Sequence, residues 1–284
     1  MTASPTKPPR PRKSLGQHFL NDGSILDRIV EAAELTADDT ALEVGPGLGA
    51  LTSRLVQRAG RVVTIELDPA LAAALPARLG NPANLTSMTG DARSADITEL
   101  VGPGIPFKML ANLPYYAANP IIRRFLESPP HPQLMVVMVQ REVAQTMVAD
   151  PGKMGILSVA VQYYARPSLV CDVPPQAFHP RPKVSSAVVK LELYAKPPVA
   201  VADPPAFFDL VRAGFSAPRK QLRNSLSRGL GAPPEQTAEL LESVDLDGRR
   251  RAETLSLEEW TALYHSWTSW SERSGLASLG LCQN

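Results

Sequence analysis

The motif Asn112-Leu113-Pro114-Tyr115 places an amide, a rigid proline and an aromatic ring side by side. The Asn112 amide oxygen and the neighbouring Leu113 carbonyl can accept hydrogen bonds from an exocyclic amine, while the Tyr115 ring stacks on the base that carries it. The motif therefore predicts a site that holds a nucleobase by its amino group. The alternative is a turn in which Asn112 caps a helix and Tyr115 packs in the core, because short motifs also occur by chance.

A glycine-rich turn precedes this motif in the chain. Residues 41–44 read as a short apolar strand that leads into Gly45-Pro46-Gly47-Leu48-Gly49, and a helix is expected over residues 50–59. Glycines let the backbone approach a ligand closely, and the N-terminus of the following helix lies beside it. The spacing differs from the G-x-G-x-x-G pattern of dinucleotide-binding turns, so the turn alone indicates only a place for close approach.

An acid ends the next predicted strand, residues 61–66. Glu66 lies about twenty residues beyond Gly45, where nucleotide-binding α/β folds hold ribose hydroxyls. A carboxylate suits this task because it only accepts hydrogen bonds. The alternative is that Glu66 or Asp68 caps the helix beginning at Pro69, and Asp68 fits the capping role better because it directly precedes that proline.

A second acid, Asp91, follows the strand expected at residues 85–88. It should reach the same edge of the sheet as Glu66, where it could accept a hydrogen bond from an adenine amine. The alternative is a local turn, because Gly-Asp pairs such as Gly90-Asp91 are common in turns.

A proline-dense loop at residues 171–183 carries a second aromatic candidate. Prolines hold such a loop extended at little entropic cost. Phe178 is either a core residue or a second stacking face, and base stacking on an aromatic ring contributes about 1–3 kcal/mol. Arg181 and Lys183 flank it and could reach phosphates.

These residues lie on a repeated strand–helix pattern. The strands are expected at residues 41–44, 61–66, 85–88, 109–111 and 134–139. Five alternations of strand and helix predict an α/β fold with a doubly wound, mostly parallel sheet. Ligands bind such sheets at the carboxyl ends of the strands, where the acids and Asn112 fall. Residues 155–164 fit either helix or strand, and residues 186–193 read as a further strand.

The pattern becomes helical after a proline-rich linker at residues 194–205. After the linker, helices are expected at residues 207–215, 220–230, 235–241 and 256–267. Before it, helices are also expected at residues 24–35 and 120–126. We therefore predict a disordered basic tail (1–12), a ligand-binding domain (13–198), a small all-helical domain (199–270) and a frayed C-terminus (271–284).

The charges are segregated although the 284-residue chain carries a net charge of only +1. Residues 1–21 and 211–234 contain no acid, and the second stretch holds Arg212, Arg219, Lys220, Arg223 and Arg228, with Arg249, Arg250 and Arg251 further on. Such clusters indicate a surface that faces a polyanion. The alternative is a solvated helix face, but no acids are interleaved between residues 219 and 228 to form helix-face pairs.

Composition excludes several classes of protein. The longest apolar stretch, residues 134–139, is far too short to cross a membrane, and the basic N-terminus is not followed by the apolar segment of a secretory signal. Cys171 and Cys282 lack metal-ligand spacing and are expected to be free thiols in a reducing compartment. His18 has no histidine or cysteine at metal spacing, so no metal site is expected.

Taken together, the motifs resemble the KsgA (RsmA) family of ribosomal RNA adenine N6-dimethyltransferases, from about Lys13 to about Tyr264. The matching segments are Leu15-Gly16-Gln17-His18-Phe19-Leu20, Glu43-Val44-Gly45-Pro46-Gly47-Leu48-Gly49, Ile65-Glu66-Leu67-Asp68, Gly90-Asp91-Ala92, Asn112-Leu113-Pro114-Tyr115, Phe178-x-Pro180-x-Pro182-Lys183-Val184-x-Ser186 and Arg219-Lys220-x-Leu222-Arg223-Asn224-Ser225-Leu226. Each motif is unspecific alone, whereas the ordered set is highly specific.

The resemblance implies a Rossmann-like methyltransferase sheet that binds S-adenosylmethionine. By position, the cofactor would contact His18, Leu20, Gly45, Gly47, Glu66, Asp91 and Asn112. Glu66 would hold the ribose and Asp91 the adenine amine, while Asn112 would reach both cofactor and target base. His18 stands where relatives often have asparagine, and a neutral imidazole can still donate or accept one hydrogen bond.

The resemblance further implies methylation of two adjacent adenosines in the hairpin near the 3′ end of 16S rRNA, on the assembling 30S subunit, by a cytoplasmic monomer. The catalytic residues would be Asn112, Leu113, Pro114, Tyr115 and Phe178, and the RNA-binding residues Arg181, Lys183, Arg219, Lys220 and Arg223. Tyr115 and Phe178 would clamp the flipped base.

Three other functions compete with this hypothesis. One is methylation of an adenine in large-subunit rRNA, as in macrolide resistance; the loop around Phe178 and the presence of Leu113 favour the small-subunit enzyme. A non-catalytic RNA-binding assembly factor would not need Glu66, Asp91 and the Asn112 motif together. Methylation of a protein glutamine would leave the basic C-terminal helices unexplained.

Overall fold

The computed structural model describes residues 17–274, which form two compact units. The first contains the chain up to Ala144 together with Ala165–Leu193, and the second contains Gln145–Tyr164 and the chain from Tyr194 onward. The predicted tail, residues 1–12, and Cys282 lie outside the described residues.

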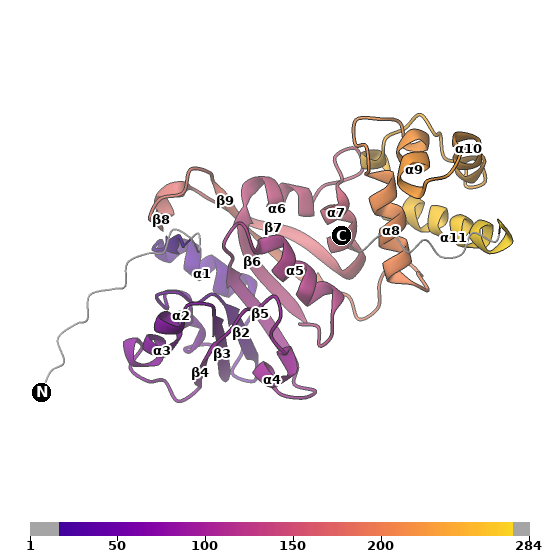
Figure 1. The fold of residues 1–284 in the computed structure, drawn as a ribbon. Coiled ribbons are helices and arrows are strands. Elements are labelled where there is room, and N and C mark those ends of the chain that lie inside the picture. The colour runs from indigo at the N-terminus through magenta and orange to yellow at the C-terminus, as the bar shows by residue number, and fades with distance from the viewer. Residues whose placement is uncertain (1–16, 275–284) are drawn as a thin grey trace, which may run out of the picture. The chain divides into compact units, whose positions relative to one another are not determined.

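A seven-stranded sheet organises the first unit, in the order β4-β3-β2-β5-β6-β9-β7 (Figure 1). Its strands are β2 (Thr40–Val44), β3 (Arg61–Glu66), β4 (Leu85–Thr89), β5 (Phe107–Asn112), β6 (Leu134–Gln140), β7 (Ala165–Val173) and β9 (Ser186–Leu193). The strands from β4 to β6 run parallel, whereas β9 pairs antiparallel with both β6 and β7, so β7 runs in the same direction as β6. The mostly parallel α/β sheet predicted from the sequence is confirmed.

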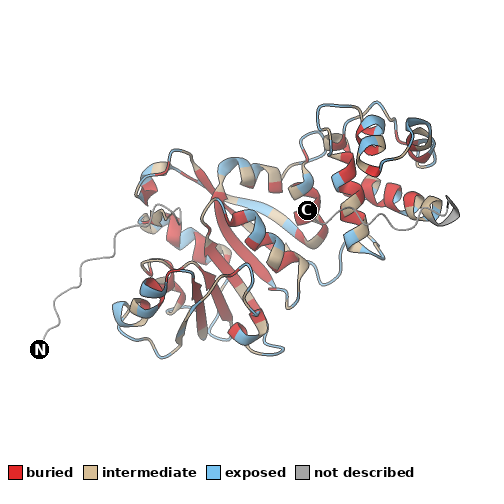
Figure 2. Ribbon diagram, in the orientation of Figure 1, coloured by how far each residue is buried: buried red, intermediate tan, exposed pale blue. Residues whose placement is uncertain are grey.

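The central strands are buried on both faces, as Figure 2 shows by the red strands in the middle of the sheet. Their continuous apolar runs reflect this, because a strand covered on both sides needs no alternation with polar residues. The covering helices are α1 (Gly23–Ala32), α2 (Thr52–Leu55), α3 (Pro69–Arg78), α4 (Ile97–Val101), α5 (Ala118–Glu127) and α6 (Arg141–Met147). Asp68 caps α3 by accepting the Ala70 N–H at 3.0 Å, which leaves Glu66 for another role.

Strand register brings the predicted site residues to one edge of the sheet. Val44 on β2 lies between Ile65 on β3 and Ala111 on β5, so the strand ends carrying Gly45, Glu66 and Asn112 are neighbours. A two-stranded sheet at the same unit pairs β1 (Phe19–Leu20) with β8 (Phe178–His179), which follows the short helix η2 (Pro175–Ala177).

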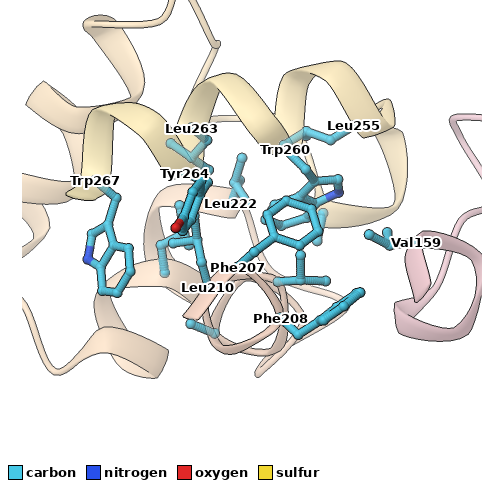
Figure 3. Packing of buried hydrophobic residues seen from close by; sticks show 14 of the residues in the cluster. Val159, Phe207, Phe208, Leu210, Leu222, Leu255, Trp260, Leu263, Tyr264 and Trp267 are labelled. Atoms are coloured by element: carbon cyan, nitrogen blue, oxygen red, sulfur yellow. The ribbon is translucent and has the colours of Figure 1, made fainter. Parts of the chain in front are cut away.

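The second unit is helical. It contains α7 (Ile156–Tyr164), α8 (Pro204–Gly214), α9 (Leu222–Leu230), α10 (Pro234–Glu242), η3 (Ala252–Thr254) and α11 (Leu257–Ser274). On α11, Trp260, Leu263, Tyr264 and Trp267 recur at helical spacing and pack on Phe207 and its neighbours, as Figure 3 shows. Gly214, the last residue of α8, is required where α8 meets α11, because a Cβ there would lie 2.3 Å from the Trp260 ring.

Some boundaries differ from the sequence-based expectation. Residues 156–164 are helical and pack in the second unit, so that unit is not a single stretch beginning at residue 199. Strand β7 was not predicted because Arg166-Pro167-Ser168-Leu169 shows no alternation and contains proline, which only an edge strand tolerates. Helix α2 is shorter than residues 50–59, and α11 continues past the predicted fraying point at Ser271.

Within residues 17–274, no helix combines the length and apolar character needed to cross a membrane. The same residues contain no group of three or more His, Cys, Asp or Glu side chains arranged to hold a metal ion. Cys171 is a buried free thiol whose pKa is raised by burial.

Candidate active site

A pocket at the carboxyl ends of β2, β3 and β5 contains every residue predicted to bind cofactor or target base. These residues are His18, Leu20, Gly45, Gly47, Glu66, Asp91, Asn112, Leu113, Pro114, Tyr115 and Phe178. The pocket also contains Glu43, Arg93 and Tyr116, to which the sequence analysis assigned no role.

The glycine turn forms the floor of the pocket. Gly45 and Gly47 have φ angles of 73° and 55°, a left-handed conformation that glycine adopts without steric cost. A Cβ on Gly47 would lie 3.0 Å from the Phe19 ring, so the turn also needs a residue without a side chain for close packing. The Gly45 N–H donates to the Ile65 carbonyl at 2.9 Å, which ties the turn to the end of β3.

Glu66 is held rigidly at the end of β3. Its Oε2 accepts the Gly47 N–H and its Oε1 accepts the Asp68 N–H, each at 3.0 Å. The side chain is only 6% exposed, and burial raises its pKa, against the opposing effect of these backbone donors. Each carboxylate oxygen keeps a further acceptor site, which suits a pair of ligand hydroxyls.

Asp91 is paired with a neighbouring arginine. The Arg93 Nε lies 2.9 Å from Oδ1 and Nη2 lies 2.5 Å from Oδ2, while the Arg93 backbone N–H donates to Oδ1 at 2.9 Å. The Arg93 hydrogen bonds lower the pKa of Asp91. The turn considered as an alternative role for Asp91 therefore forms, and Asp91 is nevertheless one of the residues that line the pocket.

Glu43 is a buried acid inside β2, only 2% exposed, that accepts a hydrogen bond from the Thr52 hydroxyl at 2.7 Å. Burial raises its pKa to about 8, and the nearby Glu66 acts in the same direction. The signal that could have identified Glu43 is an acid within the apolar run 41–44, directly before the glycine turn. Such an acid is costly to bury and is therefore a candidate functional group.

The Asn112 side chain has a defined orientation. Its Nδ2 donates to the His18 carbonyl at 3.2 Å, an assignment that follows from the hydrogen-bond pattern because a carbonyl only accepts. The acceptor Oδ1 is then the atom available to a ligand amine. The next residue, Leu113, is anchored by its N–H to the Met138 carbonyl at 3.2 Å.

His18 and Tyr115 are linked to the loop after β8. The two rings stack with centroids 5.9 Å apart and planes inclined by 27°. His18 Nδ1 donates to the Pro180 carbonyl at 2.7 Å, and the Tyr115 hydroxyl lies 2.9 Å from the Ser186 hydroxyl. Burial raises the pKa of Tyr115, so its phenol stays neutral and able to donate.

Phe178 combines the two roles that the sequence left open. It is 5% exposed and belongs to the hydrophobic cluster that contains Leu20, its partner across β1 and β8. It is also one of the residues that line the pocket. Its action as a stacking face stays a prediction.

The predicted RNA-binding residues are exposed and lie outside the pocket lining. Arg181 and Lys183 are on the loop between β8 and β9, whereas Arg219, Lys220 and Arg223 belong to the second unit. Within the described part of the chain, none of these five has an ion pair. The three consecutive arginines that the sequence analysis also placed in the basic clusters differ, because each forms an ion pair within the protein. Arg249 pairs with Asp247, Arg250 with Glu259 and Arg251 with Glu253.

The pocket fits the chemistry of S-adenosylmethionine: a glycine floor for close approach, a rigid carboxylate for ribose hydroxyls and a second carboxylate for a purine amine. Fold and site together define a Rossmann-like methyltransferase that uses this cofactor.

Comparison with known proteins narrows the class further. The family model described as ribosomal RNA adenine dimethylase matches residues 9–268, and the chain belongs to this family. The ribosomal RNA small subunit methyltransferase A of Dehalococcoides mccartyi is 46% identical over 254 residues, covering 89% of this chain and 87% of that protein. The protein of the same name from Pelotomaculum thermopropionicum is 45% identical over 269 residues, covering 90% and 91%.

Two solved structures share the fold across most of the chain. A dimethyladenosine transferase from Plasmodium falciparum superposes with a TM-score of 0.76 at 25% identity, covering 91% of this chain and 98% of that one. The 23S rRNA methyltransferase ErmE superposes with a TM-score of 0.70 at 29% identity, covering 87% and 98%.

Proposed function

We propose that this protein dimethylates N6 of two adjacent adenosines in the hairpin near the 3′ end of 16S rRNA, using S-adenosylmethionine. It acts in the cytoplasm on the assembling small subunit, as a monomer and without a metal. The observation that carries the proposal is the orientation of Asn112, whose Nδ2 donates to the His18 carbonyl while its Oδ1 is left as an acceptor, in a pocket that Glu66 and Asp91 also line.

Cofactor binding falls to the residues around the glycine turn. Glu66 accepts the two ribose hydroxyls, Asp91 accepts the purine amine, and Gly45 and Gly47 allow the backbone to lie against the ligand. When bound, the cofactor supplies an electrophilic methyl group. His18, Leu20 and Asn112 border the same space.

The target nitrogen must be activated because its lone pair is delocalised into the purine ring. Asn112 Oδ1 and the Leu113 carbonyl each accept a hydrogen bond from one of its two N–H groups. This arrangement favours a pyramidal nitrogen with an available lone pair. Transfer would break the bond between the methyl group and the sulfonium sulfur as the C–N bond forms, leaving S-adenosylhomocysteine; the proton could then pass from the nitrogen to solvent, so a dedicated base is not required. Near-attack alignment can supply roughly 7–11 kcal/mol of the barrier reduction.

The target base is held by stacking. Tyr115 offers one ring face, because His18 covers the other, and Phe178 borders the same space. Extruding a base from its stack costs a few kcal/mol, and less in a loop. The pocket must also admit a nitrogen that already carries one methyl group, because the reaction proceeds twice.

The RNA is held through its phosphates and shape by the exposed basic residues Arg181, Lys183, Arg219, Lys220 and Arg223. Binding of this kind weakens steeply as salt concentration rises.

The decisive experiment is transfer of labelled methyl groups to immature small subunits, followed by nucleoside analysis. We expect N6,N6-dimethyladenosine at two adjacent positions, with large-subunit rRNA as the comparison substrate. Asn112→Ala should bind RNA like the parent protein and transfer no methyl groups. Unchanged transfer by Asn112→Ala would refute the mechanism, and label found only in large-subunit rRNA would favour the ErmE type of activity.

A further inference from the structure

Arg93, the partner of Asp91, is a polar residue of the pocket to which the proposed function assigns no role. Three N–H groups of Arg93 converge on the Asp91 carboxylate: the backbone N–H, Nε and Nη2. Both residues line the pocket, and the Asp91 side chain is 29% exposed. The carboxylate is therefore held by charge-assisted, bidentate bonds and cannot rotate freely.

The same local geometry occurs elsewhere in the chain. Arg249 donates its backbone N–H to Asp247 Oδ1 at 2.9 Å and its Nε at 3.2 Å to the same oxygen. The same Asp-x-Arg turn thus occurs at residues 91–93 and at residues 247–249. The second copy lies outside the pocket, which shows that the turn by itself does not imply a ligand.

The pairing leaves a limited number of acceptor positions on Asp91. A carboxylate offers about four lone-pair sites. Arg93 Nε lies 2.9 Å from Oδ1 and 3.0 Å from Oδ2, and we assign its hydrogen bond to the nearer oxygen, Oδ1. With this assignment, the three N–H groups of Arg93 fill three of the four sites. The remaining site is on Oδ2, which also accepts Nη2. Asp91 can therefore accept one hydrogen bond from a ligand, and a second ligand donor would find no acceptor site on this carboxylate.

We propose that Arg93 is a positioning residue that aims this single free site of Asp91 at the purine amine of the cofactor and so sets the selectivity of the pocket for an amino-purine. The inference rests on the proposed role of Asp91 as the ligand of that amine. Without Arg93 the carboxylate could rotate, and water could hydrogen-bond to either oxygen equally well. Loss of the purine amine would then cost less binding free energy than it does with the carboxylate fixed by Arg93.

The charge of Arg93 contributes as well as its shape. Its guanidinium places a positive charge beside the carboxylate, and its hydrogen bonds lower the pKa of Asp91. Lysine preserves the charge but not the planar fork, because an ammonium group is a point donor on a flexible stem. Arg93→Lys is therefore expected to retain part of the selectivity, and Arg93→Leu almost none.

The test compares two ligands that differ only at the purine amine. The dissociation constant of S-adenosylhomocysteine is measured by calorimetry beside that of the analogue in which hydrogen replaces the amine. A hydrogen bond to a charged acceptor predicts a preference of about tenfold for the amine in the parent protein. We expect this ratio to fall below about threefold in Arg93→Leu and to be intermediate in Arg93→Lys. Arg249→Leu, the matched variant of the second turn, should keep the parent ratio.

Kinetics separate positioning from general damage. Arg93→Leu should raise the KM for S-adenosylmethionine and leave kcat nearly unchanged, whereas a misfolded pocket would lower both affinity ratio and kcat. Retention of the full preference by both Arg93 variants would overturn the inference. Asp91→Leu, which removes every acceptor of this side chain, tests the proposed role of Asp91 itself: if it also keeps the preference for the amine, Asp91 is not the amine ligand and that part of the proposed function fails instead.

Discussion

The hydroxyl groups of Tyr115 and Ser186 form a 2.9 Å hydrogen bond that joins positions 71 residues apart. Ser186 begins β9, is fully buried and pairs with Gln140 and Val173 on either side. The bond therefore fixes the ring of Tyr115 to the rigid sheet, while His18 covers one face of that ring. The remaining face has one available orientation, which is what stacking a target base requires.

This bond predicts matched effects of Tyr115→Phe and Ser186→Ala. Each variant loses one neutral hydrogen bond, which contributes about 0.5–1.5 kcal/mol, so kcat should fall by roughly twofold to tenfold while the KM for S-adenosylmethionine stays the same. The double variant should resemble either single variant, because the two substitutions remove the same interaction. Steady-state kinetics on small subunits measures these values. Ser185→Ala is the control, and additive losses would show that the bond does not act as a unit.

The site illustrates which features a sequence can reveal. Glu66 and Asp91 were predictable because Glu66 ends one predicted strand and Asp91 follows another, and parallel strands present their carboxyl ends at one edge. The Tyr115–Ser186 bond was not, because nothing local to either residue encodes a partner so far along the chain. Strand β7 was missed because, at the edge of the sheet, its exposed polar residues and proline obscure the strand pattern.

Glu43 predicts a pH dependence of stability. Its pKa is raised to about 8 in the folded protein from an ordinary value of 4.5, so the proton is bound more tightly when the protein is folded. The resulting stabilisation is fully present below pH 4.5 and is lost as the pH rises through about 8. Each unit of pKa difference corresponds to about 1.4 kcal/mol, so the effect is on the order of a few kcal/mol.

Glu43→Gln isolates this effect, because glutamine retains the shape of the protonated acid and does not titrate. The difference in unfolding free energy between parent and variant, measured by urea denaturation from pH 5 to pH 9, should shift steadily in favour of the variant. Glu66 is present in both proteins but lies close enough to Glu43 to raise the pKa of Glu43, so the comparison reports the titration of Glu43 together with its coupling to Glu66. A difference that is constant with pH would contradict a protonated Glu43.

Gly214 predicts a large effect of a single methyl group. A Cβ at this position would lie 2.3 Å from Cη2 of Trp260, which is fully buried, so Gly214→Ala must displace the indole or the backbone. Overpacking of this kind costs typically 1–3 kcal/mol. Thermal unfolding should show the loss in the second unit. Gly155→Ala is the control, because its Cβ would meet its nearest atom at an ordinary 3.4 Å; equal stabilities of the two variants would contradict the packing described here.

Replacing Arg223 or Arg249 by alanine should affect the salt dependence of RNA binding differently. Both are exposed arginines of the second unit, but Arg249 is paired with Asp247 whereas Arg223 has no ion pair among residues 17–274. If Arg223 contacts a phosphate, Arg223→Ala should weaken binding to small-subunit rRNA and reduce the slope of log affinity against log salt by about 1. Arg249→Ala removes the same formal charge and should leave the slope unchanged, because its charge is already compensated. Binding isotherms at several salt concentrations decide the matter: equal slopes for both variants would mean that net charge alone, rather than the unpaired residues at the start of α9, governs RNA binding.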